Sequence, residues 1–242
     1  MRYGIFSDIH SNIEALDAVF EAYKKEAIDK YLCVGDVVGY ASNPNECIDR
    51  VKFLAKAQVA GNHDRAAVNL FSVDYFNPFA REAISWTSRN LNDNSRYFLE
   101  SLKLLYKNED LTLVHGTLVN PEEFDYMTDV EVARETFEIL EANICFVGHT
   151  HIAGIFIRHN DGYIHYQKGG AIELKPGNKY IVDVGSVGQP RDNNPKAAYC
   201  IFDTENKKVH IKRTGYNKEG ARKKIINVGL PKLLGDRLLV GR

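Results

Sequence analysis

Short apolar runs alternate with longer amphipathic segments through the first 150 residues of the chain. The runs are rich in β-branched and aromatic residues, and each ends in glycine or in a polar residue. The first intervening segment repeats its apolar positions at helical spacing, at Ile13, Leu16, Phe20, Tyr23 and Ala27. The alternation of strand-like runs with helical segments indicates parallel β-α-β units. In such units the ligand sites gather at the carboxyl ends of the strands. The predicted strands span residues 3–7, 31–34, 58–60, 111–114 and 144–147.

Capping sequences mark where several of the helices begin. Asn12 and Asn77 both precede helical patterns, and Pro78 fits the first helical position after Asn77. Residues 128–131 form a capping-box sequence that opens a helix to about residue 140. We predict that residues 65–105 are helical, with the last helix of this segment covering about 94–104.

The pattern changes after residue 152, where strand follows strand with short turns between them. Two helices, near 217–227 and 231–239, close the chain. No linker, repeat or low-complexity tract divides it, so we predict one domain covering residues 1–242. A parallel half joined to an antiparallel half predicts an α/β fold, a four-layer α-β-β-α sandwich of two mixed sheets flanked by helices. The later strands are expected at 154–159, 163–168, 171–174, 180–184, 197–203 and 208–214.

Composition narrows the class of protein. Apolar residues make up 44% of the chain and the formal net charge is −1, which is ordinary for a globular protein and argues against a broad nucleic-acid surface. No segment resembles a membrane span or a cleavable signal, so we expect a cytoplasmic protein. The four cysteines are scattered without a C-x-x-C pair and are expected to be reduced and structural.

Candidate metal ligands stand at the end of each of the first five strands. The pair His149 and His151 would leave one face of an extended chain, although two surface histidines would give the same pattern. A metal site is favoured because the other strand ends carry nitrogen and oxygen ligands too. Such a set without thiolate suits Mn²⁺, Fe or Zn²⁺, and two ions sharing a carboxylate could clamp a phosphoryl group and activate a bridging water. The set is Asp8, His10, Asp36, Asn62, His63, Asp64, His115, His149 and His151.

The order of these motifs resembles the calcineurin-like metallophosphoesterases. The motifs are D-x-H at Asp8, G-D at Asp36, G-N-H-D at residues 61–64, H-G at His115 and G-H-x-H at residues 148–151. The resemblance continues through residues 184–192, which look like the G-S-V-G-Q-P-R segment of small bacterial and archaeal phosphoesterases, the phosphodiesterase-like branch. One departure is Asp183-Val184, where Asn-Pro is common, and the sequence gives Asp183 no role.

The resemblance implies a role for each motif residue. Asp8, His10 and His151 would hold one metal, and Asn62, His115 and His149 the other. Asp36 would bridge the two ions. His63 would protonate the leaving oxygen and bind a phosphate oxygen together with Asn62, and Asp64 could orient the His63 ring. Turn chemistry is the alternative explanation for Asn62 and Asp64.

Arg191 and the loops beyond the strand ends leave more room for interpretation. Arg191 could reach a substrate phosphate, or it could be a solvated loop residue. Tyr40 and Asn43 could line the pocket or belong to a structural loop. Residues 71–78 and 117–128 are expected to determine selectivity. Their aromatic side chains could form a lid or a subunit interface, or could pack against the body: Phe71, Tyr75, Phe76, Phe124 and Tyr126.

These features predict an enzyme, a hydrolase acting as a phosphatase or phosphodiesterase on a small phosphorylated substrate. It would use two divalent ions, with manganese favoured and Fe, Ni, Co or Zn as alternatives, and a metal-bridging hydroxide would attack the phosphorus. The alternatives are a dinucleoside polyphosphate hydrolase, a protein phosphatase, or a catalytically silent scaffold of the same fold. No membrane partner is expected, and homo-oligomers stay open.

Overall fold

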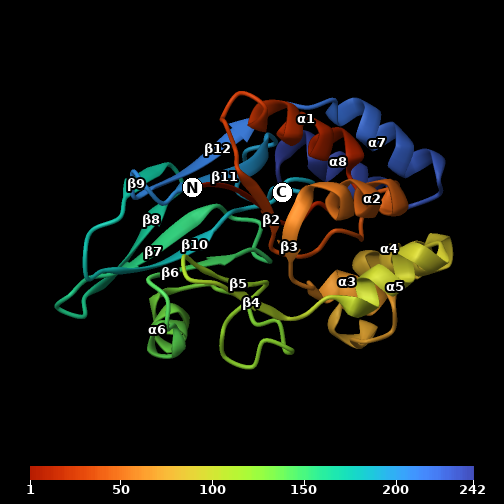
Figure 1. The fold of residues 1–242 in the computed structure, drawn as a ribbon. Helices are drawn as coiled ribbons and strands as arrows, with labels where there is room; N and C mark the ends of the chain where they lie inside the picture. Colours follow the sequence, from red (N-terminus) through yellow and green to blue (C-terminus); the bar gives the residue numbers. More distant parts are fainter.

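Two six-stranded sheets form the centre of the computed structural model, which describes residues 1–242 (Figure 1). The first sheet has the order β3-β2-β1-β11-β12-β9 and the second has the order β4-β5-β6-β10-β7-β8. The strands of the first sheet are β1 (Arg2–Phe6), β2 (Lys30–Cys33), β3 (Ala55–Gln58), β9 (Ala171–Glu173), β11 (Ala197–Asp203) and β12 (Lys208–Thr214). Those of the second are β4 (Leu105–Lys107), β5 (Thr112–Val114), β6 (Ile144–Val147), β7 (Gly154–Arg158), β8 (Ile164–Lys168) and β10 (Lys179–Asp183).

Both sheets are mixed, as the change of pattern along the sequence predicted. Strands β1, β2 and β3 run parallel, and β1 pairs antiparallel with β11. In the second sheet β5, β6 and β10 run parallel, while β10 pairs antiparallel with β7. The early β-α-β units thus supply most of the parallel strands, while the late strand β10 adds one more parallel strand to the second sheet.

Helices cover the outer faces of the two sheets, which gives the predicted four layers (Figure 1). Helices α1 (Ile13–Tyr23) and α2 (Pro44–Leu54) lie on the first sheet, and α6 (Val130–Ile139) lies on the second. No helix combines the length and the apolar character needed to cross a membrane. The others are α3 (Asn62–Ala67), α4 (Pro78–Asn90), α5 (Asp93–Ser101), α7 (Lys218–Asn227), α8 (Lys232–Val240) and the 3-10 turn η1 (Val73–Tyr75).

Alternation along the central strands fills the space on both faces of each sheet. In β1, Tyr3 and Ile5 point between the two sheets, whereas Phe6 packs under α1. In β6, Phe146 points between the sheets and Val147 packs against α6. Because both faces of these strands are buried, their sequences are continuous apolar runs.

Several predicted boundaries were wrong. The third strand covers Ala55–Gln58 and not 58–60, because the pairing with β2 begins at the end of α2 with a shift of register. Residues 65–105 are not helical throughout, since 68–77 contain only η1, and Leu105–Lys107 form an edge strand on β5. The α6 cap is Asp129 instead of Thr128, and its carboxylate accepts from the backbone N–H groups of Glu131 and Val132.

Candidate metal centre

The strand ends of both sheets converge on one cluster of buried carboxylates and imidazoles. The ligand atoms of three groups lie within 4.8 Å of one another. The groups are Asp8 with His10 and His151, Asp36 with His115 and His149, and His10 with Asp36 and His63. The first group contains the three residues expected to hold one metal, and the second contains His115, His149 and the expected bridge Asp36. Every member of these groups is buried.

Left-handed backbone conformations hold these residues in place. The φ angles are 53° at Asp8, 51° at Asp36, 68° at His149, and 50° and 62° at His10 and His151. A non-glycine residue in this region costs of order 1 kcal/mol or more, and such strain collects at functional sites.

Neighbouring loops fix that strained backbone with hydrogen bonds. The Asp8 N–H donates to the Gly35 carbonyl at 3.0 Å, and the Asp8 carbonyl accepts from Gly188 N at 2.9 Å and from Ser186 Oγ at 2.8 Å. The G-S-V-G-Q segment therefore locks the first ligand loop, which explains why it belongs to the same motif series.

Backbone carbonyls orient three of the imidazoles. Nδ1 of His10, His115 and His151 donates to the carbonyls of Val38 (3.0 Å), Val34 (2.7 Å) and Gln189 (2.6 Å), respectively. These bonds turn the Nε2 atom of each ring toward Asp8 and Asp36, the orientation found in metal-ligating histidines.

Nitrogen and oxygen atoms face one another in the first half of the cluster. His10 Nε2 lies 3.0 Å from His151 Nε2, and His151 Nε2 lies 3.2 Å from Asp8 Oδ1. Burial lowers the pKa of His10 and of His151 well below the usual value, so both rings are neutral, the state that binds a cation.

The second half of the cluster contains buried polar atoms without hydrogen-bond partners: Asp36 Oδ2, Asn62 Oδ1 and His115 Nε2. Such atoms are unfavourable unless something satisfies them. Burial opposes charge on His115, but Asp36 outweighs it and raises the pKa of His115 to about 10. His115 Nε2 lies 3.3 Å from Asp36 Oδ2 and holds a proton there. A cation bound to these two atoms would displace that proton. The residues present fit a divalent metal.

Comparison with known proteins agrees with this geometry. A sequence model described as "Calcineurin-like phosphoesterase superfamily domain" matches residues 1–207. The chain belongs to this family. It is 39% identical to an uncharacterised protein of Methanocaldococcus jannaschii, MJ0912, over 98% of this chain and 97% of the relative.

Solved structures extend the comparison. A metallophosphoesterase from Sphaerobacter thermophilus has a TM-score of 0.88 at 35% identity, covering 100% of this chain and 99% of its own. A hypothetical protein from Pyrococcus horikoshii OT3, PH1004, shares the fold, with a TM-score of 0.79 at 19% identity over 100% of this chain and 98% of its own. The calcineurin-like phosphoesterases are metal-dependent, and this member has the His/Asp clusters that such chemistry needs.

His63 packs against His10, one of the expected ligands, and its ring makes no hydrogen bond. The ring makes edge contacts with His10 and Phe76 and lies 4.5 Å from the Tyr40 ring. Burial lowers the pKa of His63 to about 4, and its Nδ1 has no partner. No hydrogen bond joins Asp64 to this ring.

Asp64 instead holds the backbone of two loops. Its carboxylate accepts from Val38 N and from Gly61 N, each at 3.1 Å. Burial, together with Asp36, raises the pKa of Asp64 to about 7. The structure therefore places Asp64 where it connects the second and third strand ends.

Arg191 lies beside the cluster with its guanidinium free of carboxylates. It donates to Tyr40 Oη at 3.2 Å and to Gln189 Oε1 at 2.9 Å, and it takes part in no ion pair. Its charge reaches the ligand residues, since it contributes to the lowered pKa of His151 after burial. Sequence reasoning had not selected Gln189, whose only signal was its place in the G-S-V-G-Q-P-R segment.

Asp183, which had no role from the sequence, supports the H-x-H loop. Its carboxylate accepts from Thr150 Oγ1 at 2.5 Å and from Gly185 N at 2.9 Å. Thr150 stands between the two ligand histidines, so Asp183 ties that loop to the end of β10.

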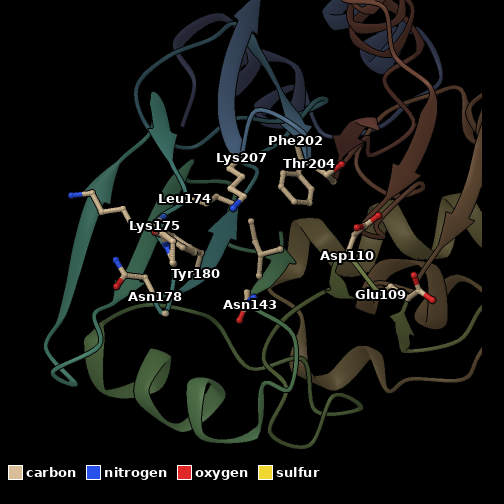
Figure 2. A pocket seen from close by; sticks show the side chains of 13 residues that line it. Glu109, Asp110, Asn143, Leu174, Lys175, Asn178, Tyr180, Phe202, Thr204 and Lys207 are labelled. Atoms are coloured by element: carbon tan, nitrogen blue, oxygen red, sulfur yellow. Dashed lines mark hydrogen bonds between the residues drawn. The ribbon is translucent and has the colours of Figure 1, made fainter.

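A hollow of about 250 Å³ lies away from these ligands (Figure 2). It is lined near the start of β6 and β10 by Ile144 and Tyr180, and near the end of the antiparallel β11 by Phe202. Asp110 and Lys207 give it both signs of charge, and it contains no histidine. Because the ligands follow the carboxyl ends of the parallel strands, this hollow is at the opposite end of the sandwich.

Proposed function

We propose that this protein hydrolyses phosphomonoesters or phosphodiesters of a small molecule at a centre of two divalent cations. The observation that carries the proposal is the position of Asp36. One oxygen, Oδ2, lies 3.6 Å from Nε2 of His10 and 3.3 Å from Nε2 of His115, one ligand from each set. A single carboxylate placed between the two sets of expected ligands is what a shared metal bridge requires.

The ligand sets would divide as the motifs imply. Asp8, His10 and His151 would hold one cation, Asn62, His115 and His149 the other, and Asp36 both. Two such ions supply charge for the phosphoryl oxygens and a bound water of lowered pKa. The oxygen and nitrogen donors suit Mn²⁺, with Fe, Ni, Co or Zn as alternatives.

His63 and Arg191 would act on the substrate itself. Burial keeps His63 neutral, and the negative charge of a bound phosphate is the partner that would favour a proton on its ring. The ring would then donate to a phosphate oxygen and to the leaving oxygen. Arg191, without a carboxylate partner, would bind a further phosphate oxygen.

Metal analysis combined with turnover tests this function. We expect two ions per chain and hydrolysis of p-nitrophenyl phosphate or bis-p-nitrophenyl phosphate when Mn²⁺, Ni²⁺, Co²⁺ and Mg²⁺ are supplied in turn. Asp36→Asn should disturb both ions, whereas Glu100→Gln, an exposed carboxylate on α5, should not. A chain without metal and without activity would instead be a catalytically silent scaffold.

His63→Ala separates chemistry from metal binding. Removal of a general acid lowers kcat by roughly 10²–10⁴, and we expect this loss with the two ions retained. Turnover near that of the unaltered protein would refute the acid role.

A further inference from the structure

A pocket of about 210 Å³ opens directly beside the metal centre. Asn62 and His149, both expected ligands of the second metal, form its inner end. The rest of its wall comes from the segments 71–78 and 117–128, which the sequence singled out for selectivity. A group bound in this pocket would therefore be attached to the phosphate that the centre holds.

Aromatic rings form most of that wall, and the two segments meet through them. Phe71 packs edge-on against Phe124, with ring centroids 5.1 Å apart at 88°, and Tyr75 stacks on Phe71 at 5.3 Å. Tyr126 stacks on the His149 ring at 3.9 Å and 18°. A ring in the pocket would thus lie among faces and edges of other rings, the arrangement that aromatic pairs prefer.

Both tyrosines of the pocket wall are exposed to solvent. Tyr75 is 75% exposed and Tyr126 is 49% exposed, although both line the pocket. A large exposed aromatic side chain at the rim of a pocket gives a surface on which a planar ligand can stack. The Tyr75 ring stacks on Phe71 and pairs with none of the expected ligand histidines, so the metal centre does not explain its position.

The charges around the pocket restrict the ligand further. Its lining contains Glu123 and Asp125 but no lysine or arginine. These carboxylates would repel a chain of phosphates, and they can accept hydrogen bonds from hydroxyl or amino groups. Arg191, the free cation beside the centre, does not line the pocket.

We propose that this pocket binds the organic group of the substrate, and that this group is an uncharged planar aromatic ring such as a nucleobase on its sugar. This inference rests on the proposed function and narrows its substrate class to esters with one phosphate between the ring-bearing group and the centre. Esters with a polyphosphate chain are disfavoured by Glu123 and Asp125.

Phosphomonoesters with and without the ring test the inference. With the metal-loaded protein, KM for adenosine 5′-monophosphate should be roughly 5- to 100-fold below KM for ribose 5-phosphate, the range that base stacking gives. Tyr75→Ala should reduce this ratio several-fold. Tyr97→Ala, a 70% exposed tyrosine on α5, is the matched control and should leave the ratio unchanged.

Adenosine diphosphate tests the role of the acidic residues. Its KM should exceed that of the monophosphate, and Glu123→Gln should reduce the difference between the two KM values. An equal or lower KM for the diphosphate in the unaltered protein would contradict the charge argument.

A binding measurement distinguishes failure of this inference from failure of the proposed function. Saturation-transfer NMR should detect adenosine, but not ribose, on the unaltered protein, and the signal should weaken in Tyr75→Ala. Hydrolysis of adenosine 5′-monophosphate and ribose 5-phosphate with equal KM would overturn the pocket assignment but not the proposed phosphoesterase function. Adenosine binding without hydrolysis of any ester would retain the pocket and refute the proposed reaction. Absence of adenosine binding would overturn the inference in either case.

Discussion

Arg191 is the residue beside the centre whose charge is least compensated. Its guanidinium is held by a phenol and an amide, Tyr40 and Gln189, and both partners are neutral. Positioning by neutral groups leaves the full positive charge available to an anion. Arginine suits this task because its planar fork can bind two phosphate oxygens at once.

Arg191→Ala should therefore weaken binding according to the charge of the substrate. A hydrogen bond to a charged group contributes about 1.5–3 kcal/mol, so KM for dianionic p-nitrophenyl phosphate should rise roughly 10- to 100-fold. The monoanionic bis-p-nitrophenyl phosphate should be affected less. Arg89→Ala, at an exposed position near the end of α4, serves as the control. An equal effect on both esters would mean that Arg191 acts through packing.

Asp183 gives a prediction for stability against pH. Burial raises its pKa well above the usual value of 3.8, so the folded protein retains this proton at pH values where the unfolded chain has lost it. In that window the unfolded chain binds fewer protons, and rising pH destabilises the fold. Asn does not titrate; its Oδ1 can accept from Gly185 N, and its amide N–H can donate to Thr150 Oγ1.

Asp183→Asn should flatten this dependence. Unfolding by urea in EDTA should be measured between pH 5 and pH 9. As the pH rises, the free energy of unfolding should fall less in the variant than in the unaltered protein. Both proteins have the same histidines, so the difference reports on residue 183. Parallel pH profiles would show that Asp183 is ionised in the folded protein.

At the scale of elements, the loop after β6 is constrained by close contact with the loop after β1. A Cβ on Gly148 would lie 2.2 Å from Ser7 Oγ and 2.5 Å from Asp8 Oδ2. The absence of a side chain at Gly148 thus lets a ligand loop of the second sheet approach one of the first. His149 N donates to Asp8 Oδ2 at 3.1 Å across the same contact.

Gly148→Ala should separate the two loops. Overpacking of this kind costs typically 1–3 kcal/mol, and displacement of Asp8 should lower metal content below two ions per chain and reduce kcat/KM by at least about tenfold. Gly215→Ala is a matched control, since a Cβ there meets nothing within 4 Å. Full metal content in Gly148→Ala would indicate that the loops move together.

The sequence predicted the strands that carry the site better than the elements between them. Runs such as residues 144–147 are rich in apolar β-branched and aromatic residues, so the local sequence pattern is sufficient to predict these strands. The edge strand β4 was missed because Leu105–Lys107 is short and is defined only by pairing with β5. The left-handed φ at Asp8 and His10 depends on loops distant in sequence. The motif order therefore selected residues that cluster in the structure but could not predict their backbone conformation.

The whole molecule joins its two sheets through the centre. Asp8, His10, Asp36 and Asn62 follow strands of the first sheet, whereas His115, His149 and His151 follow strands of the second. In one half of the cluster His115 pairs with Asp36, and several buried polar atoms have no hydrogen-bond partner. Ions that bind this arrangement, and not the unfolded chain, must stabilise the sandwich as a unit.

Metal removal should therefore lower thermal stability in one cooperative transition. A ligand at 100 times its Kd contributes about 2.7 kcal/mol, which corresponds to a decrease in Tm of roughly 5–10 °C for a chain of this size when an ion is withdrawn by EDTA. Asp36→Ala should have a low Tm already and respond weakly to EDTA, while Glu100→Ala should respond like the unaltered protein. If EDTA removed both ions and left Tm unchanged, the ions would not bind the folded chain in preference to the unfolded one, and the centre would not stabilise the fold.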